Sequence, residues 1–275
     1  MAERGRLLIG AFEDAEHAGR FASRVAFIPQ ERILEQWPQA RAAFLGTPRG
    51  TVPPATSLEP ATVRELTERL ESAPLLCSSL KGHQWRISNV PLADLVTAQP
   101  HVNLSRVEMM MDRIKEGLVP LMFPTDTAVQ VKTEAADGPT ISFISDRREL
   151  TFTAARVQRL EGSGAIEVVM RIEPRPNYVS VVDSRGRLFV RNGNHRLVAA
   201  WRAGLREVAC VVIEGDVSKL FEERWNKLSV AALLFERSPR LSDLADCASG
   251  CIEVDLRPRR FVTRVRAEQL SNYGD

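Results

Sequence analysis

The chain has 275 residues, of which 44% are hydrophobic and 26% charged, and this composition excludes a largely disordered or fibrous protein. Its formal net charge of +2 is too small for a protein built wholly around coating nucleic acid. No apolar stretch approaches the roughly 18 residues of a membrane span. Residues 1–22 carry acids and arginines instead of the apolar core of a signal peptide, so we expect a cytoplasmic protein without membrane contact.

The N-terminal part of the chain contains few strong signals. It has a short apolar run at Leu7–Ile9 and helical patterns at Glu31–Leu45 and Ser57–Leu70. Between the two helical patterns, the prolines and glycines of residues 46–57 indicate a loop. Together these elements are small for an independent core. We therefore predict that residues 1–84 form a helical N-terminal extension that packs on the main domain.

The signals become clearer from residue 85 onward. A strand at Arg86–Val90 precedes a helix that begins at a capping box of Ser105 and Glu108 and ends near Gly117. A further strand is predicted at Pro120–Phe123. Four β-like runs separated by turn-forming residues then predict a strand-rich insertion at about 125–177. These runs are Ala128–Lys132, Thr140–Ile144, Leu150–Thr153 and Ile166–Ile172.

A hairpin and a helix surround an Asn-Gly turn in the next segment. The apolar runs Tyr178–Val182 and Arg187–Val190 are joined by Asp-Ser-Arg-Gly, which favours a type I turn with glycine at the positive-φ position. After the turn at 192–196, we predict a helix over Leu197–Ala203 and a buried strand over Val208–Ile213. The order is therefore strand, polar glycine turn, helix, strand, and it completes a main domain over 85–214.

Residues 215–275 are predicted to form a helical C-terminal extension with a basic tail. Asp216 caps one long helix whose apolar residues recur at spacings of 4, 3, 4 and 3. Core packing is the main interpretation of this stripe, and a homodimer face is the alternative. The stripe consists of Phe221, Trp225, Leu228, Ala232 and Phe235. A short helix near Leu241–Ala248 and a strand at Ile252–Leu256 precede a tail over 257–266 that has five arginines and no acid.

The four cysteines do not form a recognisable framework. Cys77, Cys210, Cys247 and Cys251 are too few and too scattered for a disulfide scaffold. Cys247 and Cys251 lack the second His or Cys pair that a zinc site requires. We therefore predict no metal site held by the protein.

The turn at 191–196 is the candidate functional site. Glycine lets the backbone approach a ligand closely, and the amides at the start of the next helix can donate to an anion such as phosphate. Arg196 would add a bidentate contact, His195 a donor or proton carrier, and Asn194 an amide that orients the ligand. Residues 171–206 contain eight arginines and two acids, a net charge of +6. An ordinary Asn-Gly turn with a solvated arginine is the alternative interpretation.

The order of elements resembles the ParB/sulfiredoxin-like fold, also called the ParB N-terminal or ParB-like nuclease domain. The matching segments are VPLADL at 90–95 with Gln99-Pro100, RIKEGLVP at 113–120, NGNHR at 192–196 before AAWRAG at 199–204, and Val208–Ile213. They cover about 86–124 and 178–214. The resemblance implies an α+β fold in which the turn binds nucleotide phosphates. It assigns that role to Gly193, Asn194, His195 and Arg196, and also suggests Asn103, Ser105 and Arg106 at the start of the facing helix.

The chain departs from the family in ways that affect its activity. Sulfiredoxins need a cysteine where this chain has Asn194, so repair of oxidised cysteine is not expected. Related turns often begin with Asp, whereas Asn192 has no carboxylate for a metal or a proton. His195 and Asp183 are the candidate catalytic residues, with Glu173 and Glu108 as other carboxylates. The downstream helix-turn-helix of partition proteins is not apparent.

The sequence leaves several functions open. The leading hypothesis is a nucleotide-binding protein that hydrolyses a nucleoside triphosphate, or transfers its phosphoryl group, with Mg²⁺. The alternative is a nucleic-acid-binding accessory protein of the partition or regulatory type, without turnover, whose arginines bind the phosphates of DNA or RNA. A third is a degenerate domain for protein–protein contacts. The arginines of the basic tail are Arg257, Arg259, Arg260, Arg264 and Arg266.

Overall fold

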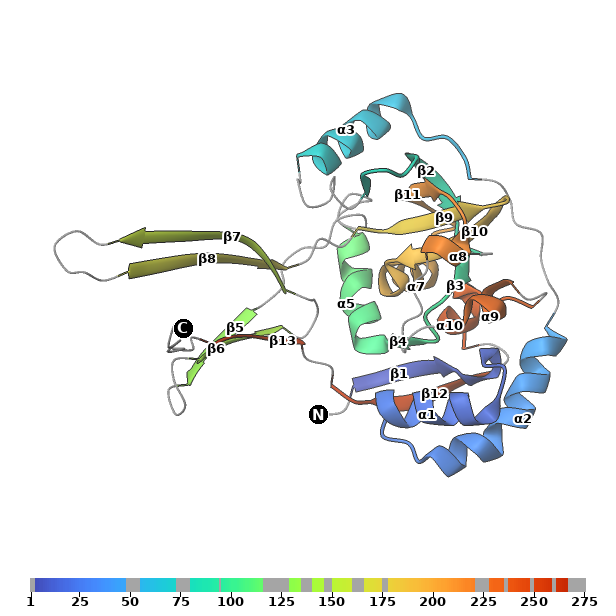
Figure 1. Ribbon diagram of the computed structural model, residues 1–275. Helices are drawn as coiled ribbons and strands as arrows, with labels where there is room; N and C mark the ends of the chain where they lie inside the picture. The colour runs from blue at the N-terminus through green and yellow to red at the C-terminus, as the bar shows by residue number, and fades with distance from the viewer. Residues whose placement is uncertain are drawn as a thin grey trace, which may run out of the picture. The chain divides into compact units, whose positions relative to one another are not determined.

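The computed structural model is a mixed α/β protein of two compact units, each described here by itself (Figure 1). Unit 1 comprises Met1–Pro124 and Asn177–Arg257, and unit 2 comprises Thr125–Pro176 and Pro258–Asp275. The structure describes residues 3–47, 55–72, 80–93, 95–115, 129–134, 140–145, 150–159, 166–174, 178–220, 228–234, 237–247, 250–258 and 261–266. Among the helices in these ranges, none is long and apolar enough to cross a membrane.

Unit 1 contains two sheets and the helices that cover them. Its strands are β1 (Glu3–Leu8), β2 (Trp85–Pro91), β3 (Val96–Thr97), β4 (His101–Asn103), β9 (Ser180–Ser184), β10 (Arg187–Asn192), β11 (Glu207–Glu214) and β12 (Cys251–Leu256). Its helices are the 3₁₀ helix η1 (Ile9–Ala11) and α1 (Ala15–Val25), α2 (Gln30–Gly46), α3 (Pro60–Glu71), α5 (Leu104–Ile114), α7 (Asn194–Arg202), α8 (Val217–Leu220), α9 (Val230–Leu234) and α10 (Leu241–Ala245).

A five-stranded sheet in the order β2-β11-β9-β10-β3 forms the centre of unit 1. The strand β11 is buried on both faces, which explains its continuous apolar run. Val208, Cys210 and Val212 belong to the main core, whereas the alternate residues Ala209, Val211 and Ile213 pack in a second cluster. That second cluster includes Leu66 and Leu70 from α3. The predicted strands at 86–90, 178–182, 187–190 and 208–213 are thereby confirmed, with small shifts of their ends.

The N-terminal segment is part of unit 1 and not an appendage to it. Strand β1 lies between β12 and β4 and pairs antiparallel with both. The buried residues Leu7, Leu8 and Ile9 join the main core. Helix α2 confirms the predicted helix at 31–45, whereas α1, which begins at the N-cap Asp14, was not predicted from the sequence.

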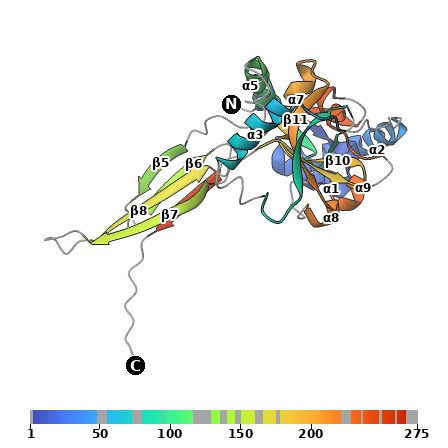
Figure 2. The ribbon, with the colours of Figure 1, turned by 90° about the horizontal axis from the view of Figure 1, so that it is seen from above.

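Unit 2 consists of β-strands in the part that the structure describes. A three-stranded sheet has the order β13-β6-β5, with β5 at Val129–Glu134, β6 at Thr140–Ser145 and β13 at Phe261–Arg266. Strands β7 (Leu150–Arg159) and β8 (Ile166–Pro174) pair as an antiparallel ribbon (Figure 2). This confirms the strand-rich character predicted for 125–177. The predicted basic tail differs, because residues 261–266 pair with β6 and so belong to the same sheet.

Three local predictions were wrong. Helix α5 is capped by Asn103, whose Oδ1 accepts from the Arg106 amide at 3.0 Å, instead of by Ser105. The hairpin turn has positive φ at both Arg185 and Gly186, which is the geometry of a type I′ turn; a two-residue loop favours that type because its twist matches the strands.

The third wrong prediction is the single long helix after Asp216. The amide of Leu228 donates to Ala98 O, and Ser229 Oγ accepts from the Ala232 amide, so a new helix, α9, starts there. Leu228 and Ala232 are buried in the main core, as the core-packing interpretation expects. The predicted elements around Gly117 and Pro120–Phe123 lie outside the described residues, as do Phe221, Trp225 and Phe235.

Candidate functional site

Gly193 links β10 to α7 in a conformation that favours glycine. Its φ is 99° and its ψ 16°, in the left-handed region. A Cβ atom at this position would lie 3.0 Å from Val179 Cγ2 and 3.2 Å from Val179 Cα. Both the backbone conformation and the packing against Val179 therefore require glycine. Because Gly193 is also the N-cap and has no side chain, it offers no side-chain acceptor to the first turn of α7.

The side chain of Asn194 points into the protein and joins α7 to the end of β3 and the segment after it. Its Oδ1 accepts a hydrogen bond from Oγ1 of Thr97, the last residue of β3, at 2.6 Å, and its Nδ2 lies 3.5 Å from Oε1 of Gln99, just after β3. Thr97 is fully buried and Asn194 nearly so. In this arrangement Asn194 holds the start of α7 in place. The Asn194 side-chain amide is thus engaged by the protein and not presented to a ligand.

His195 connects the first turn of α7 to the start of α5. Its Nε2 accepts a hydrogen bond from the backbone N–H of Asn103 at 3.0 Å. Asn103 caps α5 with its Oδ1, and its Nδ2 donates to the Glu3 carboxylate. Figure 1 shows α5 and α7 side by side in unit 1, and their many close contacts agree with the picture. The structure therefore places the N-termini of two helices next to one another, and we call the place where residues 103–106 and 193–196 meet the junction.

The environment of His195 keeps its ring neutral. Burial, followed by the charges of Arg106, His101 and Arg196, lowers the pKa of His195 from 6.5 to about 3. The hydrogen bond accepted by Nε2 acts in the same direction, because it occupies the lone pair that a proton would take. A ring with this pKa does not carry protons near neutral pH. The arrangement is that of a structural hydrogen-bond acceptor in a positively charged environment.

The two arginines beside His195 differ in exposure. Arg196 is 4% exposed, and its charge also acts on the thiol of Cys210. Arg106, in the first turn of α5, is partly exposed, and Ser105 next to it is exposed. Among the side chains matched to the family, Ser105 is therefore exposed, Arg106 and His195 are partly exposed, and Asn103, Asn194 and Arg196 are buried.

Asp183 lies away from this junction. In the β9–β10 hairpin Ser180 pairs with Asn192, which precedes Gly193. Asp183 pairs with Leu188 at the other end of the hairpin, near the Arg185-Gly186 turn. Asp183 is three positions along β9 from Ser180, which is roughly 10 Å in a strand. Asp183 forms an ion pair with Arg86, whose Nη2 lies 3.1 Å from Asp183 Oδ2. The structure therefore does not bring Asp183 and His195 together.

The other candidate carboxylates and the arginines of the basic tail belong to several different elements. Glu108 is exposed on α5, and Glu173 belongs to β8 of unit 2. Arg257 is used by the fold, because its Nε donates to Ser23 O and Ala26 O at the end of α1 and its guanidinium stacks over Phe27. Arg264 and Arg266 belong to β13, and Arg259 and Arg260 lie outside the described residues.

The junction does not have the donor set of a protein-held magnesium site. Mg²⁺ prefers carboxylate and phosphate oxygens. Within the described ranges, no group of three His, Cys, Asp or Glu residues could hold a metal ion. At the junction the carboxylate engaged with these residues is Glu3, bonded to Asn103, and the arginines around His195 oppose a further cation.

Three residues of the junction were not found from the sequence. Thr97 and Gln99 bind Asn194, and Glu3 binds Asn103. The pairs are separated by 97, 95 and 100 residues in the chain. The only local signal in the sequence is the Gln99-Pro100 segment, which belongs to the family resemblance.

Comparisons of the chain with protein-family models, with curated proteins and with solved structures found no match.

Proposed function

We propose that unit 1 is a ParB/sulfiredoxin-like domain that binds the phosphates of a nucleotide where α5 and α7 begin. The observation that carries the proposal is the hydrogen bond from the Asn103 amide to His195 Nε2, which joins the first turns of the two helices. Each helix N-terminus has backbone N–H groups without intrahelical acceptors and a partial positive charge. Two such ends at one place favour a ligand with several negative oxygens.

The surrounding side chains add to this preference for an anion. The charges of Arg106 and Arg196 both lower the pKa of His195, so both guanidinium groups add positive potential at the junction. Arg106 and Ser105 supply a guanidinium and a hydroxyl from the first turn of α5. Gly193 and Asn194 then have a supporting role, because they fix the direction in which α7 starts. In this proposal the phosphates contact the backbone amides of α7 and the side chains of Ser105 and Arg106.

We propose binding and assign no residue to proton transfer. His195 is neutral and its Nε2 is engaged, and Asp183 is paired with Arg86 at the other end of its strand. Hydrolysis of a nucleoside triphosphate, or transfer of its phosphoryl group, would need a base that these residues do not provide. Measuring nucleoside triphosphate hydrolysis and phosphoryl transfer alongside nucleotide binding tests whether the protein is an enzyme.

The test is a titration of the full chain with the four nucleoside triphosphates, each with and without magnesium. The decisive variant is Arg106→Gln, and the matched control is Arg202→Gln, which removes the same charge from the opposite end of α7. Loss of a charge-assisted hydrogen bond costs about 1.5–3 kcal/mol, so Arg106→Gln weakens binding by roughly 10- to 150-fold. Arg202→Gln leaves it nearly unchanged. Equal affinity in a folded Arg106→Gln protein contradicts the proposed site.

Nucleic-acid binding by unit 2 is a second candidate, favoured by one observation. Positions 264 and 266 are both arginines of strand β13, which pairs with β6 in unit 2. On duplex DNA, each phosphate contact that is lost reduces the slope of log affinity against log salt by about 0.9. The double variant Arg264→Gln/Arg266→Gln should flatten that slope by nearly two. A chain that shows no salt-dependent DNA binding excludes this candidate.

A further inference from the structure

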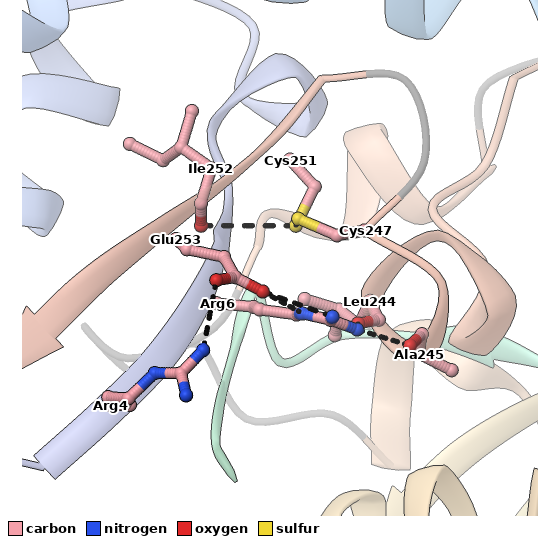
Figure 3. Close-up of polar contacts among 8 residues, drawn as sticks. All are labelled: Arg4, Arg6, Leu244, Ala245, Cys247, Cys251, Ile252 and Glu253. Carbon is pink, nitrogen blue, oxygen red and sulfur yellow. Dashed lines mark hydrogen bonds and ion pairs between the residues drawn. The ribbon is translucent and has the colours of Figure 1, made fainter. Parts of the chain in front are cut away.

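Two cysteines that are separated in unit 1 only by a short turn have their sulfur atoms in direct contact. Cys247 follows α10, and Cys251 is the first residue of β12. Cys247 Sγ donates a hydrogen bond to Cys251 Sγ at 2.8 Å, and Cys251 Sγ lies 3.9 Å from Ile252 O (Figure 3). Both thiols are free and both residues are partly exposed. Neither residue belongs to the nucleotide site proposed above.

The backbone on each side of the turn is held in left-handed conformations. Cys247 has a φ of 49°, which is uncommon for a residue with a side chain. Gly250 has a φ of 84°, and a Cβ there would lie 2.8 Å from Ala40 O and 2.9 Å from Phe44 Cβ. Cys247 and Gly250 thus both have sterically demanding backbone conformations beside the two thiols. Unusual backbone conformations of this kind are concentrated at functional positions.

One arginine fastens both ends of this turn. Arg6 of β1 donates from Nη1 to Leu244 O at 3.2 Å and to Ala245 O, at the end of α10. Its Nε and Nη2 bind Glu253 Oε1, each at 3.1 Å, just after Cys251 in β12 (Figure 3). Arg6 therefore fixes the positions from which both cysteines project, and it also places a positive charge near them.

The two thiols have different acidities. A hydrogen bond that the Cys251 thiol donates to the Cys247 thiolate lowers the pKa of Cys247, and the charge of Arg6 adds to this effect, whereas burial opposes it. The pKa of Cys251 is raised, first by its hydrogen bond with Cys247 and then by burial. The charge of Glu253 acts against Arg6 at both thiols. Because the thiolate is the nucleophile of cysteine chemistry, Cys247 is the attacking residue and Cys251 the resolving one.

We propose that Cys247 and Cys251 form a thiol–disulfide exchange site that reacts with low-molecular-weight disulfides such as oxidised glutathione. The Cys247 thiolate attacks one sulfur of the small disulfide, forms a mixed disulfide and releases one thiolate, which takes up a proton. Cys251 then loses its proton, attacks the Cys247 sulfur and expels the second small thiol. The two protein thiols are oxidised by two electrons, and the small disulfide is reduced to two thiols.

The short loop makes this bond easy to reverse. A disulfide stabilises a fold mainly in proportion to the logarithm of the loop that it closes, and only three residues separate Cys247 from Cys251. Folding therefore stabilises the Cys247–Cys251 disulfide only a little. Its formation follows the ratio of thiol to disulfide in the surrounding solution. Cys210, by contrast, is fully buried and burial raises its pKa, so it does not react under the same conditions.

The test is oxidation of the folded full chain in glutathione buffers of increasing oxidised fraction, followed by acid quenching, blocking of free thiols and tryptic mass spectrometry. Cleavage after Arg240 and Arg259 releases fragment 241–259, which contains Cys247 and Cys251 and no other cysteine. We expect this fragment to lose two hydrogen atoms, with no glutathione attached, and to recover them in dithiothreitol.

Two single variants identify the roles of the cysteines. Cys251→Ser should trap glutathione on Cys247 because the resolving thiol is missing, and Cys247→Ser should react many times more slowly. A fragment that keeps two free thiols in strongly oxidising buffer overturns the proposal, as does glutathione held stably on both cysteines of the unaltered chain. Equal trapping by the two single variants overturns the assignment of Cys247 as the attacking residue.

Discussion

The neutral state of His195 can be tested through the pH dependence of stability. The folded pKa of His195 is about 3 and its ordinary value is 6.5. Below about pH 6.5 the unfolded chain therefore binds a proton that the folded chain does not, and the folded state loses stability as the pH falls toward about 3. At about pH 5 the loss is RT ln(1 + 10^1.5), or about 2 kcal/mol, and at about pH 7.5 it is below about 0.1 kcal/mol.

The reference protein for this measurement is His195→Gln. A glutamine amide oxygen can accept the Asn103 N–H but does not titrate, and the other histidines are present in both proteins. Urea unfolding of both proteins at about pH 7.5 and about pH 5 gives the difference in unfolding free energy at each pH. We expect this difference to shift by about 2 kcal/mol in favour of His195→Gln at the lower pH.

The result depends on the unfolded pKa, because about pH 5 lies well above the folded value of about 3. A difference that is the same at both pH values would refute the reasoning. It would mean that the ring protonates in the folded protein as readily as in the unfolded chain, and His195 would then be available as a proton carrier.

Two further predictions concern stability. Arg237 and Asp243 form an ion pair at 2.7 Å with side chains only 6% and 4% exposed, and Arg237 also donates to Phe44 O. Arg237→Ala should cost about 3–5 kcal/mol in urea unfolding, whereas loss of the exposed Lys115–Asp112 pair in Lys115→Ala should change little. Gly193→Ala adds contact with Val179 to its left-handed strain, whereas Gly186→Ala at a φ of 74° meets no atom within 4 Å. Thermal unfolding should show a cost of about 1–2 kcal/mol for Gly186→Ala and a larger cost for Gly193→Ala, and equal costs would contradict the packing argument.

The sequence predicts best those helices and strands whose buried residues form a regular pattern within one segment of the chain. Strand β11 is predictable because every residue of 208–213 is apolar, and α7 because an Asn-Gly turn precedes it and Gly204 follows it. Helix α1 carries both helical signals, because Ala18, Phe21 and Ala22 recur at helical spacing on its buried face and Asp14 caps its start. Most of its apolar residues are small alanines, so the stripe stands out less than a stripe of large side chains.

The contacts at the candidate junction were not predictable in the same way. Gly193, Asn194, His195 and Arg196 were identified as a group, but the roles of their side chains depend on partners about a hundred residues away. Asn194 binds Thr97, and His195 binds the amide of Asn103. No local pattern indicates that an asparagine will face inward or that an imidazole will accept a backbone hydrogen bond. The contact between Cys247 and Cys251 likewise depends on a positive φ at a residue other than glycine.

The pairing of β1 with β12 has a consequence for how the protein folds during synthesis. Glu3 of β1 pairs with Leu256 of β12, so the two partners are made far apart in time. At a synthesis rate of about 5–20 residues per second, β12 is made roughly 10–50 s after β1. The strand that completes the sheet of unit 2, β13, is made later still. Both units therefore close with strands from the last part of the chain, and a chain arrested before residue 250 leaves a sheet edge exposed in each of them.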